Sequence, residues 1–100
     1  MTDDLRAKLE AAIDETTWTP LAMHAKRDAL FVVDATLGLV PAAHAVALDR
    51  QAVVALWLES GLVRRPTTDE RAAWDSEPEA RRFRFVIVQP FVLVEPLADA

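Results

Sequence analysis

The sequence contains no cysteine, and this absence excludes two classes of protein. Without cysteine the chain forms no disulfide, so it is not a disulfide-stapled secreted scaffold, and it binds no metal ion through thiolates. Tyrosine and asparagine are also missing, and the only glycines are Gly38 and Gly61. Neither glycine belongs to a G-x-G-x-x-G or P-loop pattern, so binding of a nucleotide through a glycine-rich loop is excluded.

Positive charge is scarce as well, because 11 Lys+Arg stand against 16 Asp+Glu, for a formal net charge of −5. This sign disfavours nucleic acid as a partner. No window reaches the ~20 apolar residues of a membrane span, and the acidic start Met1-Thr2-Asp3-Asp4 is unlike a basic secretory signal. We therefore expect a cytoplasmic domain with no membrane or nucleic-acid partner.

Apolar residues, by contrast, are abundant at 52%, and 18 of the 100 residues are alanine. This apolar fraction is too high for a disordered tail, and a chain of this length is large enough for one hydrophobic core. We expect a single domain over residues 1–100, with an ordered core over about 3–95.

Four helices are predicted from apolar residues that recur every three or four positions. They cover residues 3–14, a short segment from Pro20, residues 50–60 and about two turns after Thr67. Glu70 completes a capping box with Thr67. Asp49 is a suitable N-cap for the helix 50–60, and the wide apolar surface of that helix predicts burial on more than one side.

About four strands are predicted, over residues 29–33, 42–48, 62–65 and 83–95. Residues 42–48 stay open between strand and helix, because their alternation favours a strand and their alanines favour a helix. The strand is our first interpretation. The segment 83–95 is apolar on both faces, as in a central strand or an interface, and Pro90 within it predicts a bulge or a break in pairing. The order α-α-β-β-α-β-α-β then predicts an α+β fold, a mainly antiparallel sheet covered by helices.

Acid–base chemistry has few candidates. His24 and His44 are the only imidazoles, and their spacing matches no metal-ligand motif, so we expect no metal and no cofactor. Both fit packed core histidines; the alternatives are a catalytic base or, for His44, a pH-sensitive pair with a carboxylate. Gln89, beside Pro90, interrupts an apolar strand, so it is either part of a polar site or the partner of backbone groups that the bulge leaves open.

Arginines at the ends of predicted strands are the main candidates for a ligand site. Arg64 and Arg65 end one strand, whereas Arg82 and Arg84 enter the last one and project from the same face. If these strands are neighbours, the guanidinium groups converge on an anion or phosphate. The alternative is that the arginines pair with surface glutamates, which stabilises little.

Several strings of the sequence resemble one bacterial family. They are Met23-His24-Ala25-Lys26-Arg27-Asp28-Ala29, Leu37-Gly38-Leu39-Val40, Val54 with Trp57, Arg65-Pro66, and Arg82-Phe83 followed by Val86-Ile87-Val88-Gln89-Pro90-Phe91-Val92-Leu93-Val94. Together they are similar to the "domain of unknown function 2288" family, from about Leu5 to Glu95. This resemblance implies a small single-domain protein and no activity, substrate or catalytic residue. The chain departs from the family pattern at Gly38 and Pro41, where such proteins tend to carry acidic residues.

The function we predict is that of a non-enzymatic interaction module that associates with itself. A 100-residue domain has few positions enclosed on both faces of a sheet, so the two-faced segment 83–94 predicts a homodimer that buries Phe91 and Leu93. The first alternative is a protein that binds a small molecule or anion through the four arginines. The second is a small enzyme with His24 or His44 as its base.

Overall fold

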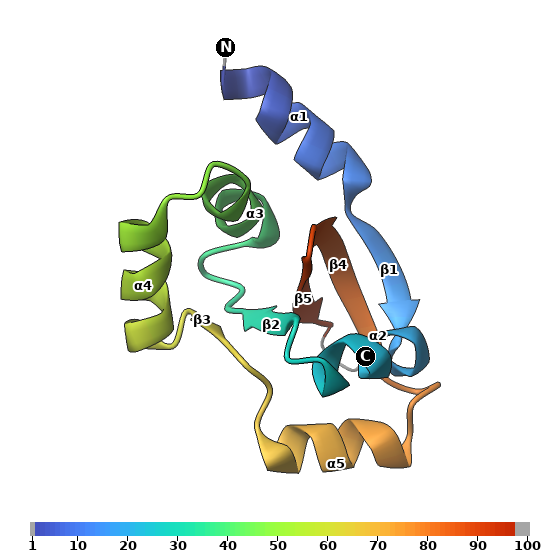
Figure 1. Cartoon of the computed structure of the whole chain (residues 1–100). Coiled ribbons are helices and arrows are strands. Elements are labelled where there is room, and N and C mark those ends of the chain that lie inside the picture. Colours follow the sequence, from blue (N-terminus) through green and yellow to red (C-terminus); the bar gives the residue numbers. More distant parts are fainter. Residues whose placement is uncertain (1, 98–100) are drawn as a thin grey trace.

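A five-stranded sheet runs through the molecule, and the computed structural model describes residues 2–97 (Figure 1). The helices are α1 (Thr2–Ala12), α2 (Trp18–Lys26), α3 (Leu39–Ala47), α4 (Gln51–Ser60) and α5 (Thr68–Ser76). The strands are β1 (Asp14–Thr17), β2 (Leu30–Val33), β3 (Val63–Arg64), β4 (Arg82–Val88) and β5 (Phe91–Pro96). They lie in the order β1-β4-β5-β2-β3 across the sheet, and all neighbours are antiparallel except β2 and β5, which are parallel.

The predicted α+β class is therefore confirmed, but residues 2–97 form five helices and five strands instead of about four of each. The additional strand is β1, which forms one edge of the sheet beside β4. Its sequence, Asp14-Glu15-Thr16-Thr17, has no apolar alternation. It is a strand because it pairs with β4, and no pattern within its own sequence predicts that pairing.

The predicted strand 83–95 is a hairpin of two strands, β4 and β5. The strands pair from Val88 and Phe91 outward, and the Gln89–Pro90 peptide bond between them is cis. The prediction of one long strand is wrong, and of the two outcomes expected at Pro90, a bulge or a break in pairing, the structure shows the break. Proline donates no hydrogen bond to a sheet ladder, and in this chain it occupies the turn, where the ladder needs no donor.

The sheet is covered on both faces, and each face has its own hydrophobic cluster because successive residues of a strand point to opposite sides. One cluster joins β2, β4 and β5 to α2 and α5, through Leu30, Val32, Phe83, Val92, Trp18 and Trp74. The other joins the same strands to α1 and α3, through Val33, Val86, Leu93, Leu9, Leu39 and Ala43. In Figure 1, α5 lies below the sheet, and α1 and α3 lie above it.

Three aromatic rings close the α2/α5 face of the sheet. Trp18, at the start of α2, is 1% exposed and lies 4.9 Å from Trp74 of α5 and 5.6 Å from Phe83 of β4, between ring centroids. Its indole Nε1 donates a hydrogen bond to Oδ1 of Asp75 at 2.6 Å. The buried ring therefore keeps a polar partner while it ties two helices to the sheet.

Residues 42–48 belong to helix α3 up to Ala47, so the strand interpretation is wrong. Leu39, Ala42, Ala43 and Val46 recur at helical spacing and face the cluster on the α1/α3 face. Ala42 and Ala43 are buried, so α3 lies close to the sheet. Alanine favours helix by propensity, and the apparent alternation of the segment has no structural counterpart.

Two aspartates end helices by adopting the left-handed conformation. Asp28 follows α2 with φ 57°, and Asp49 follows α3 with φ 55°. After α2, the N–H of Asp28 donates to the carbonyl of Ala25, and the N–H of Ala29 donates to that of His24. After α3, the N–H of Asp49 donates to the carbonyl of Val46, and the N–H of Arg50 donates to that of Ala45. Both helix ends are therefore Schellman motifs. The prediction of Asp49 as N-cap of α4 is therefore wrong, because it closes the preceding helix.

We expect Asp28→Gly to raise the free energy of unfolding by about 0.5–1 kcal/mol, because glycine occupies the left-handed region without a Cβ penalty. Asp28→Val is the matched contrast and should lower it, because a β-branched side chain resists positive φ most strongly. Urea unfolding of the three proteins measures both effects. A lower stability of the glycine variant would contradict this account of the helix end.

Candidate functional site

The four candidate arginines do not come together, because β5 and β2 separate β3 from β4. They also belong to opposite faces. Arg64 pairs in register with Val32, which faces α2 and α5. Arg82 and Arg84 alternate along β4 with Phe83 and so point to the α1/α3 face. The guanidinium groups are expected to converge only if β3 and β4 are neighbours, and these strands are not neighbours.

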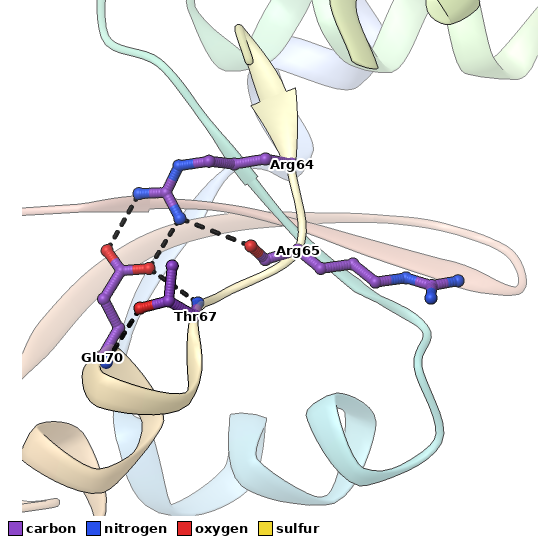
Figure 2. A network of polar contacts seen from close by, with 4 residues as sticks. All are labelled: Arg64, Arg65, Thr67 and Glu70. Atoms are coloured by element: carbon purple, nitrogen blue, oxygen red, sulfur yellow. Dashed lines mark hydrogen bonds and ion pairs between the residues drawn. The ribbon is translucent and has the colours of Figure 1, made fainter. Parts of the chain in front are cut away.

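Arg64 connects β3 to the start of α5 (Figure 2). Its Nη1 and Nη2 donate to Oε1 and Oε2 of Glu70 at 2.6 and 2.9 Å. Glu70 also completes the predicted capping box: its N–H donates to Oγ1 of Thr67, and its Oε1 accepts from the N–H of Thr67. The hydrogen bonds from Arg64 hold the pKa of Glu70 below its ordinary value, and those to Glu70 raise the pKa of Arg64. The positive charge of Arg64 is therefore paired with the Glu70 carboxylate, and the pair connects β3 to α5 within the fold.

The carbonyl oxygen of Arg65 accepts a hydrogen bond from Nη1 of Arg64 at 3.4 Å, but the side chain of Arg65 points away from this network, as Figure 2 shows. Its Cζ lies 5.7 Å from the centroid of the Phe31 ring, a cation–π distance. Phe31 is half-buried and packs against the cluster of the α1/α3 face. Arg64, the last residue of β3, and Arg65, which follows the strand, therefore serve opposite faces although they are adjacent in sequence.

Arg82 and Arg84 lie among carboxylates. Nη2 of Arg82 is 3.5 Å from Oε1 of Glu15 on β1, with both side chains more than half exposed. Arg84 lies in register with Glu15 on one side and with Glu95 of β5 on the other. This row of alternating charge agrees with the alternative expectation of surface ion pairs, and exposed pairs of this kind contribute little to stability.

The structure brings two members of the possible polar site together and leaves the third apart. His24 in the last turn of α2 and Gln89 in the β4–β5 turn line one open groove of about 570 Å³, together with Arg27 and Asp28. Gln89 is exposed. His44 lies in α3, is 9% exposed, and its Nε2 has no hydrogen-bond partner among the described residues. It packs in the fold and belongs to neither groove lining.

The two interface candidates differ in their surroundings. Leu93 is 1% exposed and belongs to the core of the α1/α3 face. Phe91 is half-buried and meets the ring of Phe31 edge-on, with centroids 5.7 Å apart. The helices of one chain therefore enclose most of β5 on both sides, so the expected apolar excess of this segment is largely satisfied within the chain.

Among the helices that the structure describes, α4 exposes the most apolar surface, although single apolar side chains elsewhere, Met23, Leu48 and Ile87, are exposed as well. Seven of its ten residues are apolar, yet none of them is buried. Leu56 is 63% exposed and Leu58 is 45% exposed. The predicted burial of this helix on more than one side is thus wrong for the single chain. In Figure 1, α4 lies at the left edge of the molecule, beside α3 and away from the centre of the sheet.

A slot of about 290 Å³ separates α4 from the sheet. Phe31, Phe91 and Leu93 line it from the sheet, Val54 and Leu58 from α4, and Ala45 from α3. The slot is also lined by three exposed polar residues, Asp49 and Arg50, which connect α3 to α4, and Gln51, which begins α4. No sequence motif marks this site; its only signal in the sequence is a helix too apolar to be solvated on all sides.

No group of three or more His, Asp or Glu side chains within the described residues is arranged to hold a metal ion. None of the helices between residues 2 and 97 is long and apolar enough to span a membrane.

Comparisons with known proteins agree with this fold. A family model described as "Protein of unknown function (DUF2288)" matches residues 4–96. The chain belongs to the DUF2288 family. This DUF2288 chain is also similar to the NMR solution structure of PA1075 from Pseudomonas aeruginosa, with a TM-score of 0.78 and 32% identity over 96% of this chain and 87% of that chain. No protein with a curated description matches the sequence.

The Arg64–Glu70 pair should make stability of this DUF2288 chain depend on pH. Because the pKa of Glu70 is lowered in the folded state, its contribution is full above the ordinary glutamate pKa and is lost as pH falls through the lowered value. Glu70→Gln keeps a residue suited to the capping box but removes the charge. We expect it to cost about 0.5–1 kcal/mol at neutral pH, with a smaller cost near about pH 3.

Chemical unfolding at a series of pH values measures this difference. Glu77→Gln is the matched control, since Glu77 is exposed and forms no ion pair that the structure shows. The free energy of unfolding of this variant should change with pH in the same way as that of the parent protein. A constant difference between parent and Glu70→Gln across the acid range would rule out the ion pair as the source.

Proposed function

We propose that this chain works as a non-enzymatic interaction module that pairs with a second copy of itself through one side of α4. The observation that carries the proposal is a helix with seven apolar residues of ten and none buried. We call the side formed by Ala52, Val53 and Leu56 the Leu56 face, because these positions fall within about 100° of each other on a helix. An exposed apolar face of this kind is typical of a protein–protein contact.

Charge favours a second copy as the occupant. Glu59 is the only charged residue of α4, and it lies in the last turn, where the helix dipole disfavours a negative charge. In an antiparallel pair of α4 helices related by a two-fold axis, each Glu59 lies beside the N-terminus of the partner's helix, where the dipole favours it. Self-pairing therefore relieves an unfavourable feature of the single chain.

The area that α4 can bury limits the affinity of this contact. A ten-residue helix is about 15 Å long, which is too short to supply the ~800 Å² per partner of a standard interface. The contact must extend to neighbouring residues, and Leu48, just before α4, is also 43% exposed. We expect a dimer of moderate affinity. The proposal retains the sequence-based expectation of a cytoplasmic bacterial protein.

Sedimentation velocity over a concentration series tests this pairing. We expect dimer at roughly 100 μM and at least a tenfold weaker association for Leu56→Glu, because the substitution buries a charge at the interface. Met23→Glu on α2 is the control, since Met23 is 58% exposed and lies outside α4. Both substitutions leave the monomer's stability nearly unchanged. A strictly monomeric parent protein would refute the proposal.

Glu59→Lys separates pairing from ordinary helix stability. In the single chain, lysine near the C-terminus of α4 should raise the free energy of unfolding by about 0.3–1 kcal/mol. In the antiparallel dimer the same lysine lies beside the partner's N-terminus and should weaken association. Equal or tighter association of this variant would contradict the antiparallel arrangement.

A further inference from the structure

The slot beneath α4 has the properties of a binding site for a small molecule. Ligand sites in proteins are mostly apolar cavities with a few polar groups at defined places. This one reaches the core, because Leu93 and Ala45 in its wall are buried, while Val54 and Leu58 of α4 form the opposite wall. Phe31 and Phe91 meet edge-on within it and present a fixed aromatic surface.

The polar groups lie at the exposed part of the slot, and one of them carries a charge without a partner. Both carboxylate oxygens of Asp49 are 3.3 Å from Nε2 of Gln51, which donates to them. The Arg50 guanidinium has no hydrogen bond or ion pair with the side chains that the structure describes. An arginine that has no carboxylate of its own is suited to bind one from a ligand.

We propose that the slot binds a small molecule that combines an apolar body with a single carboxylate. The body lies between α4 and the two phenylalanine rings, and the carboxylate accepts hydrogen bonds from Arg50. The volume of about 290 Å³ lies at the lower limit of ligand pockets, so the body is a medium-length chain or a single ring. The proposal does not depend on self-association, because Leu58 faces the slot and Leu56 lies on the opposite side of the helix, about 160° away.

Titration with sodium octanoate, followed by NMR of the methyl groups, tests the site. We expect shifts of the Val54, Leu58 and Leu93 methyls that saturate together. 1-Octanol serves as the uncharged analogue of similar length. It should bind in the same place, roughly three- to tenfold more weakly, because it cannot form a charge-assisted pair with arginine. Absence of saturable shifts with either compound would overturn the proposal.

Two variants test which residues bind the carboxylate and which line the apolar part of the site. Arg50→Gln should weaken octanoate roughly three- to tenfold and leave octanol unchanged. Arg84→Gln on β4 is its control, because Arg84 does not line the slot. Ala55→Phe should fill the slot and abolish both titrations, whereas Ala72→Phe at an exposed position of α5 should not. Equal affinity of octanoate and octanol, or an octanoate affinity that Arg50→Gln leaves unchanged, would overturn the carboxylate assignment.

Circular dichroism shows whether Ala55→Phe still folds, and Arg50→Gln, an exposed substitution, decides the question of charge in either case. Leu56→Glu separates this site from the proposed dimer. It should bind octanoate as the parent protein does, even where it no longer associates. Loss of octanoate binding in that variant would place the ligand at the contact between copies and overturn the slot as the site.

Discussion

The architecture depends on one constraint: the central strands β2 and β5 are apolar on both faces, and a chain of 100 residues must cover both sides of them. Four helices meet this need, α2 and α5 on one face and α1 and α3 on the other. The large rings of Trp18 and Trp74 fill the first side, and small alanines let α3 approach the second. The packing of the sheet thus uses most of the chain's helices.

The same constraint explains the position of α4. It connects α3 to the edge strand β3, so it lies beside the sheet instead of over its centre. Leu58 and Val54 turn toward the slot, whereas Leu56 points away from it. One helix therefore presents two apolar surfaces with different shapes, one concave and one convex. A concave apolar surface suits a small molecule, and a convex one suits another protein chain.

Local signals predicted much of the fold. The capping box of Thr67 and Glu70, the buried strand after Ala29 and the helical stripe near the N-terminus are all present, because each depends on residues only three or four positions apart. The predictions that are wrong concern residues whose local structure depends on neighbours in space and not on neighbours in sequence. Asp49 suits either end of a helix, and only the bonds to the preceding turn show that it ends α3.

The sequence by itself determined the α+β class, the family, the excess of apolar surface and the exclusion of thiolate and glycine-loop chemistry, because composition and short-range periodicity carry that information. The tertiary structure alone decided where the excess is exposed and which charges meet. Arg64 and Arg82 both looked available along the chain, but strand order separates them, and register and alternation place them on opposite faces with glutamates as partners. Strand order and register are set by long-range packing, and for that reason only the folded chain shows the exposed apolar side of α4 and the slot beneath it.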